Sequence, residues 1–99
     1  AYPDINAVFA CNDEMALGAL EAVRSAGLQD KIIVVGFDAI ADAVKSVEEG
    51  GLAGTVAQKP YEIGKMGVDA ALKFLNGEKL EETTYVPVEL ITKESLEKK

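Results

Sequence analysis

The strongest constraint on the fold is a continuous run of β-branched and apolar residues at positions 32–37. A strand with one face in water alternates apolar and polar residues, whereas this run contains no polar residue. Strands of this kind are typical of parallel sheets, which are covered on both faces. Two further apolar runs, at residues 5–11 and 52–57, predict strands on either side of it in the sequence.

Segments with helical character separate these strands. Residues 13–26 are rich in Ala, Leu and Met, which favour helix, and Asn12 or Asp13 can cap that helix at its start. Gly27 fits its end. A second helix is predicted by one apolar stripe at i, i+3, i+4 and i+7, formed by Ile40, Ala43, Val44 and Val47.

The last third of the chain predicts one more helix and one more strand. Pro60 suits the first turn of a helix over residues 60–76, which carries an apolar face. The fourth strand is expected over residues 85–91, where Pro87 argues for an edge position or a crossing segment. The charged tail, 93–99, is expected to fray or to form a short helix.

The strands and helices alternate, and this order predicts an α/β fold. We expect three layers, α/β/α, around a mainly parallel sheet of the Rossmann-like or flavodoxin-like kind. Residues 1–92 would form a single domain and 93–99 a tail. In such sheets, ligands bind beyond the carboxyl ends of the strands.

Composition excludes several functions. The net charge of the 99 residues is −7, which disfavours nucleic acid and anionic membrane surfaces as partners. With no His and a single Cys, the chain has no Ser-His-Asp or Cys-His set and no thiolate–imidazole zinc set. No apolar run is long enough to cross a membrane, and the start has no signal-peptide pattern. Composition therefore excludes these His- and Cys-based sets, and we expect no catalytic residue, no metal and no cofactor.

The candidate binding residues each stand at the end of an apolar strand. Asn12, Asp38 and Gln58 would present amide and carboxylate groups, which suit a neutral ligand rich in hydroxyls. Phe37 could cover the apolar C–H face of a sugar ring. No catalytic pair of carboxylates is visible in the pattern.

Each of these residues also has a purely structural interpretation. Asn12 and Asp38 could be helix caps, Phe37 could belong to the core, and Gln58 could be a solvated linker residue. Cys11 is expected to be a small buried apolar residue.

Three motifs resemble one known family. They are the stretch from Ala7 to Ala19, the stretch Val34-Val35-Gly36-Phe37-Asp38, and the stretch from Gly54 to Pro60. Together they resemble the periplasmic sugar-binding proteins of the ribose-binding type. The first motif is shared with the effector domains of lactose-repressor-type regulators, whereas the third favours the ribose-binding branch.

The resemblance implies half of a two-lobed, type I periplasmic binding protein that closes on a monosaccharide by hinge bending. Residues 1–58 and 80–92 would come from the carboxyl-terminal sugar-binding lobe. Residues 59–79 would supply a hinge and a helix that pack on the other lobe, with a second hinge near 80–83. Asn12, Asp38 and Gln58 would then hydrogen-bond the sugar, and Phe37 would line the pocket.

The same resemblance implies a fragment, because the amino-terminal lobe of the family has no counterpart in this sequence. We therefore expect weak or undetectable ribose binding by this chain alone. The helix at 60–76 would fold back onto the sheet or exchange between two copies, and exposed sheet edges favour self-association.

The favoured function is that of a non-enzymatic, extracytoplasmic protein that binds a monosaccharide for uptake by an ABC transporter permease. D-Ribose is the favoured sugar. The alternative is the sugar-effector domain of a lactose-repressor-type regulator. A small α/β enzyme or phospho-receiver is a third and weaker reading, since fold alone does not fix function.

Overall fold

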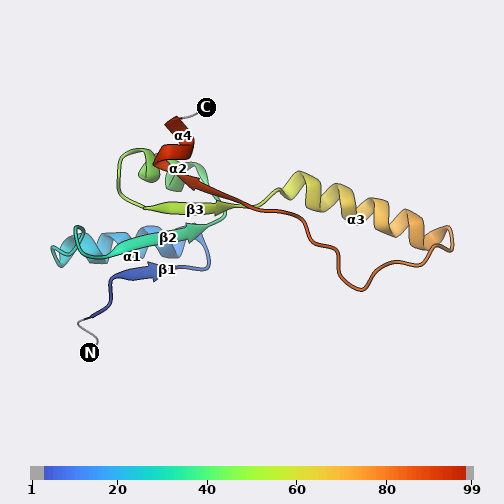
Figure 1. Ribbon diagram of the computed structural model, residues 1–99, viewed down its shortest axis with the longest axis horizontal. Coiled ribbons are helices and arrows are strands. Elements are labelled where there is room, and N and C mark those ends of the chain that lie inside the picture. The colour runs from blue at the N-terminus through green and yellow to red at the C-terminus, as the bar shows by residue number, and fades with distance from the viewer. Residues whose placement is uncertain (1–3, 98–99) are drawn as a thin grey trace. The chain divides into compact units, whose positions relative to one another are not determined.

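The computed structural model describes residues 4–97, in which strands and helices alternate from β1 to α4 (Figure 1). The chain divides into two compact units. The first, called the sheet unit below, runs as far as Ala57 and resumes at Glu89. The second, called the helix unit, is Gln58–Val88.

The sheet unit contains one four-stranded sheet in the order β1-β2-β3-β4. The first three strands are parallel and the fourth is antiparallel to β3, so the predicted mainly parallel sheet and the edge position of the last strand are both confirmed. The strands are β1 (Ala7–Phe9), β2 (Ile33–Phe37), β3 (Gly54–Ala57) and β4 (Glu89–Thr92).

The fourth strand begins later than predicted. We expected it over residues 85–91, whereas β4 starts at Glu89 and ends at Thr92. Pro87 has no backbone N–H to give to a ladder, so pairing with β3 begins only after it. Residues 58–88, which directly precede β4 in the chain, belong to the helix unit.

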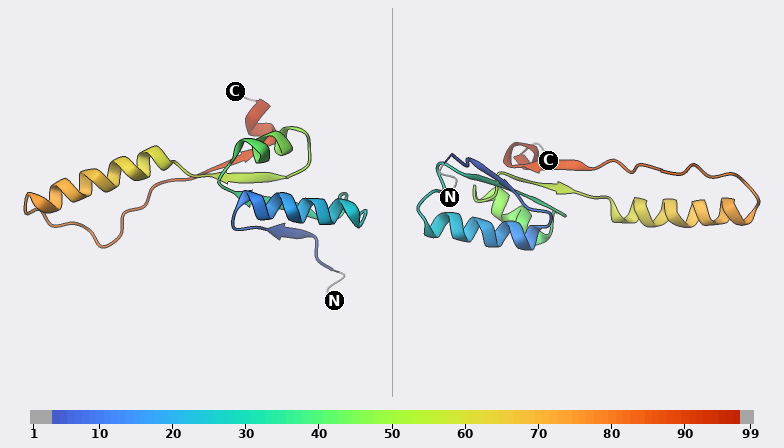
Figure 2. Two further views of the ribbon diagram at one scale, coloured as in Figure 1. Left: turned by 180° about the vertical axis from the view of Figure 1, so that it is seen from behind. Right: turned by 90° about the horizontal axis from the view of Figure 1, so that it is seen from below.

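Two helices, α1 (Asp13–Ser25) and α2 (Ala41–Glu48), cover the same face of the sheet (right-hand view of Figure 2). Because β1, β2 and β3 follow one another in one direction across the sheet, right-handed crossovers place both helices on one side. Leu96 of the short helix α4 (Lys93–Glu97) packs against the same core. The core consists of Ala16, Leu20, Val23, Val34, Ala43, Val47 and Leu52.

The opposite face of the sheet is apolar and open within the sheet unit. Strand residues alternate between faces, so residues next to buried Val34 and Ile91 point to this side. Phe9, Ile33 and Leu90 are 60%, 54% and 55% exposed. The α/β fold is confirmed, but the described residues of the sheet unit form only two of the three expected layers.

The helix unit consists of α3 (Pro60–Leu75) and the irregular segment that follows it. Pro60 starts the helix as predicted, and Gly77, at φ 83°, follows its end. No residue of α3 is buried. On the predicted apolar face, Ile63 and Phe74 are 44% and 68% exposed, whereas Met66 and Ala70 are half-buried, so this face is only partly covered.

The tail forms a short helix, one of the two predicted outcomes, and its last two residues lie outside the described part of the chain. Thr92 and Ser95 cap this helix reciprocally. The Thr92 N–H donates to Ser95 Oγ at 2.8 Å, and the Ser95 N–H donates to Thr92 Oγ1 at 3.1 Å. Within residues 4–97, no helix has the length and apolar content required to cross a bilayer.

Candidate functional site

Parallel pairing brings the carboxyl ends of β1, β2 and β3 to one edge of the sheet. Val8 pairs with Val34, and Phe37 pairs with Val56, so the three strands end close to one another in register. The segments that follow β1 and β2 carry Asn12 and Asp38. This is the edge at which α/β sheets bind ligands.

Asn12 is the N-cap of α1, which confirms its capping interpretation. Its Oδ1 accepts a hydrogen bond from the Met15 N–H at 2.9 Å. This capping bond involves only the amide oxygen, so the two N–H donors of Nδ2 take no part in it. The side chain is only half-buried, so capping and ligand contact are compatible roles for the same residue.

Asp38 stands in a strained segment directly after β2. Its φ is 121° and that of Ala39 is 59°, values that residues other than glycine rarely adopt. Such a conformation costs about 1–3 kcal/mol and is concentrated at functional sites. The Asp38 N–H donates to Val56 O at 2.8 Å, which ties this strained segment to β3.

The capping interpretation of Asp38 is wrong. The N-cap of α2 is Ile40, which has no side-chain capping bond of its own. The Ile40 N–H instead donates to Asp13 Oδ2, at 2.8 Å, so a carboxylate from the start of α1 serves the start of α2. The exposed carboxylate of Asp38 is therefore not explained by helix capping.

A buried polar network lies beneath the Asp38 segment. Asp13 and Thr55 are both fully buried. Thr55 Oγ1 donates to Asp13 Oδ1 at 2.6 Å and accepts from the Ala39 N–H at 3.1 Å. The sequence pattern predicts only a capping role for Asp13 and no role for Thr55; the signal that could have identified Thr55 is its lone hydroxyl in an otherwise apolar strand.

Gly36 provides the space for this network. A Cβ at this position would collide with Asp13 Oδ1 and would lie 2.9 Å from the Cβ of Ala16. Glycine is required here for close approach of α1 to β2 rather than for an unusual φ. The carboxylate of Asp13 therefore fills the volume that a side chain would occupy in an ordinary strand.

The remaining candidates differ in their surroundings. Phe37 is half-buried and absent from the core, because strand alternation places it on the face opposite α1 and α2. Gln58 is exposed, follows the last residue of β3 in the chain, and is the first residue of the helix unit. Cys11 is exposed, so its predicted burial is wrong; it lies in the turn between β1 and α1 rather than in the strand.

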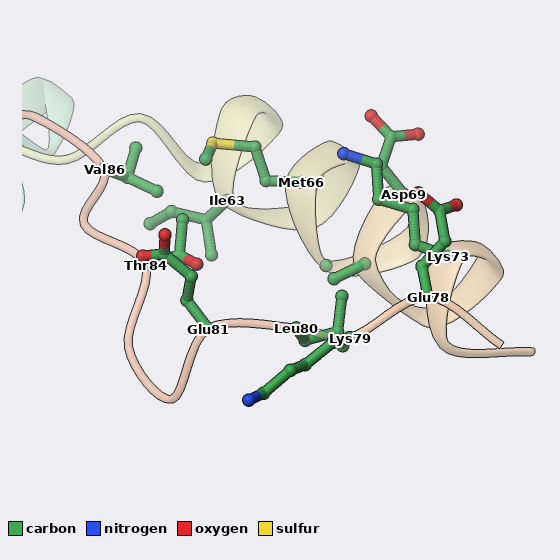
Figure 3. A pocket seen from close by; sticks show the side chains of 12 residues that line it. Ile63, Met66, Asp69, Lys73, Glu78, Lys79, Leu80, Glu81, Thr84 and Val86 are labelled. Carbon is green, nitrogen blue, oxygen red and sulfur yellow. The ribbon is translucent and has the colours of Figure 1, made fainter.

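A separate pocket of about 520 Å³ lies within the helix unit (Figure 3). Met66 and Leu80 contribute apolar side chains, whereas Asp69, Lys73 and Glu78 bring charges to it. The pocket contains none of the four predicted site residues. Within residues 4–97, no group of three or more His, Cys, Asp or Glu side chains is arranged to hold a metal ion.

Comparison with known proteins identifies the family. Residues 1–79 match the model of the periplasmic binding protein domain. The ribose import binding protein RbsB of Escherichia coli is 51% identical over 94 residues, which are 95% of this chain and 31% of that protein. The chain thus spans about a third of the length of such relatives.

Solved structures agree with this assignment. A periplasmic solute-binding protein of an ABC transporter from Actinobacillus succinogenes, with bound D-allose, matches with a TM-score of 0.81 and 36% identity over 98% of this chain and 34% of that one. A periplasmic ribose ABC transporter protein from Conexibacter woesei matches with a TM-score of 0.83 and 33% identity, over 96% of this chain and 33% of its own. The chain therefore belongs to the periplasmic binding protein domain family.

Proposed function

We propose that this chain is part of an extracytoplasmic solute-binding protein that binds a monosaccharide and delivers it to an ABC transporter permease. D-Ribose is the favoured sugar. The supporting observation is the 51% identity to a ribose import binding protein over nearly the whole chain. The proposal is also supported by the positions of Asn12 and Asp38 after β1 and β2, at the edge where α/β sheets commonly bind ligands. The function is binding rather than catalysis, and the location is the periplasm or its equivalent.

The chemistry of the four residues fits a sugar. The Asp38 carboxylate can accept hydrogen bonds from two hydroxyls, and bonds to a charged acceptor are the stronger kind. Asn12 Nδ2 can donate to a sugar oxygen while its Oδ1 caps α1. Gln58 would both donate and accept, and the ring of Phe37 would cover the C–H face of the sugar.

The regulator alternative is less well supported. The relatives and structures described above are import and solute-binding proteins. The net charge of −7 also offers no surface for DNA. The sequence similarity therefore supports a transport role, and the charge disfavours a DNA-binding one.

Closure around the sugar would require parts of the protein beyond this chain, which spans about a third of the length of its relatives. We propose that the segment after Gln58 and residues 80–83 act as hinges, and that residues 59–79 pack on a second lobe. Hinge closure of two lobes would exclude water from the bound sugar.

The test is a chimera in which this chain replaces the matching segment of the Escherichia coli ribose import binding protein. Calorimetric titration with D-ribose would compare Asn12→Ala, Asp38→Ala and Gln58→Ala. We expect Asp38→Ala to cost about 1.5–3 kcal/mol of binding free energy, and each amide variant about 0.5–1.5 kcal/mol.

The matched control is Asp30→Ala. Asp30 is an exposed carboxylate that precedes β2, at the other end of the strand from Asp38. Its removal should leave the affinity unchanged. Losses that are negligible for Asn12, Asp38 and Gln58 alike would contradict the proposal.

The chain by itself should behave differently from the chimera. We expect ribose binding too weak for calorimetry, together with self-association driven by the open apolar sheet face, where Phe9 is 60% exposed, and by the outer strands β1 and β4. Sedimentation equilibrium tests this expectation. A strictly monomeric chain at high concentration would contradict the self-association.

A further inference from the structure

We propose that Asp13 and Thr55 are positioning residues of the sugar site: without touching the ligand, they fix the backbone that aims Asp38 at it. This inference rests on the proposed function, because it assumes that Asp38 contacts the sugar. It assigns a role to two fully buried polar side chains that the proposed sugar contacts do not use.

The segment after β2 needs such support. Asp38 and Ala39 both have positive φ, a conformation that persists only where the surrounding structure enforces it. Three consecutive backbone N–H groups are held: that of Asp38 by Val56 O, that of Ala39 by Thr55 Oγ1, and that of Ile40 by Asp13 Oδ2. Two of these three acceptors are the side chains in question.

The two side chains act as one unit. The Thr55 hydroxyl has a single proton, which it donates to Asp13 Oδ1, while its oxygen accepts from Ala39. The carboxylate of Asp13 uses one oxygen for Thr55 and the other for Ile40. Loss of the hydroxyl would therefore release Ala39 directly and remove one partner of the carboxylate that holds Ile40.

The network also connects the proposed sugar contacts. Asp13 is adjacent in the chain to Asn12, and Ala39 is adjacent to Asp38. Asp13 and Thr55 therefore link the start of α1, the segment after β2 and strand β3 through side chains that are 0% exposed. The relative positions of Asn12 and Asp38, which a sugar would sense, depend on this link.

The first experiment measures amide hydrogen exchange of the 99-residue chain by NMR, comparing Thr55→Val with Thr55→Ser. Valine keeps the volume of threonine but removes the hydroxyl, whereas serine keeps the hydroxyl. We expect Thr55→Val to speed exchange at Ala39 and Ile40 by about tenfold relative to other amides of the sheet unit, and Thr55→Ser to restore protection.

Ser46→Ala is the matched control. Ser46 is also a buried hydroxyl, and its Oγ accepts from the Leu52 N–H at 3.1 Å, before β3 rather than after β2. This variant should expose the Leu52 amide and leave Ala39 and Ile40 protected. If Thr55→Val unfolds the chain, hydrogen exchange at Ala39 and Ile40 is measured in Asp13→Asn instead. The amide has one acceptor oxygen, so it can serve only one of the two donors, the Thr55 hydroxyl or the Ile40 N–H.

The second experiment titrates D-ribose into the chimera carrying Thr55→Val, Thr55→Ser, Ser46→Ala or Asp38→Ala. We expect Thr55→Val to weaken binding by about three- to tenfold, with recovery in Thr55→Ser and no change in Ser46→Ala. In the first experiment, unchanged hydrogen exchange at Ala39 and Ile40 in Thr55→Val would overturn the positioning role.

The two proposals fail in different ways. If Thr55→Val speeds exchange but leaves ribose affinity intact while Asp38→Ala weakens it, the positioning role is overturned and the sugar site stands. If Asp38→Ala also leaves affinity intact, the positioning role is overturned because Asp38 does not contact the sugar; the sugar site itself is overturned only if Asn12→Ala and Gln58→Ala are equally without effect.

Discussion

The two units of the chain follow the same local rules with different results. In the sheet unit, the apolar faces of α1 and α2 are buried against the sheet, α1 on β2 and α2 on β3 and β4, with Ala16, Ala43 and Val47 all 0% exposed. In the helix unit, α3 has an equally clear apolar face and no buried residue. Apolar periodicity therefore predicts which face of a helix is suited to packing, but not whether another element of this chain packs against it.

The difference matters for stability, because most helical stability in proteins comes from packing rather than from propensity. The sheet unit has a core and a buried polar network within its own described residues. The helix unit has neither; Pro60 at the start of α3 and Gly77 after its end define a helix without burying it.

The largest expected effect contrasts two leucines. Leu52→Ala removes a core side chain that is 2% exposed, and should lower the free energy of unfolding by about 2–5 kcal/mol. Leu75→Ala, at a position 78% exposed, should change it by less than about 0.5 kcal/mol. Urea denaturation of both variants measures this. Similar losses in the two would show that α3 is as well packed as the sheet unit.

A smaller effect contrasts two glycines. Gly36→Ala would force a Cβ against Asp13 and should cost about 1–3 kcal/mol of stability. A Cβ at Gly64 in α3 meets no atom within 4 Å, so Gly64→Ala should favour its helix by about 0.5–1 kcal/mol. Denaturation midpoints and circular dichroism check the pair. A harmless Gly36→Ala would mean that Asp13 is not closely packed against β2.

The smallest effect concerns positive φ. Both units use glycine for it, as at Gly77 in the helix unit and Gly50 in the sheet unit, but the sheet unit also holds Asp38 at φ 121°. Asp38→Gly should therefore stabilise the chain by up to about 1 kcal/mol while weakening ribose binding by the chimera. Thermal unfolding and calorimetry measure the two quantities. Loss of stability in Asp38→Gly would show that its side chain supports the fold.

Much of the fold could be predicted from the sequence, because local signals agree with the final structure. The run at 32–37 predicted a parallel strand, and Asn12 predicted the cap of α1. The start of β4 was misplaced because Pro87 sits inside an apolar run. The open face of the sheet was not foreseen, since an apolar residue such as Ile33 has the same sequence pattern whether or not a layer covers it.

The positions of the candidate site residues at strand ends could be predicted from the sequence, but the buried side chains that hold the segment after β2 could not. The rule for strand ends identified Asn12 and Asp38 from sequence alone. The pairing of Asp13 with Thr55 joins residues 42 positions apart, which no local pattern reports. The strain at Asp38 is equally a product of tertiary contacts, because nothing in the residue type requires a positive φ.

The most direct test of the account maps D-ribose onto the chimera by NMR, following the backbone amides of this chain. We predict that the largest ligand-induced shifts occur at Asn12, Asp38 and Gln58. Shifts confined to the pocket of the helix unit, around Met66 and Leu80, would place the ligand elsewhere and contradict the account.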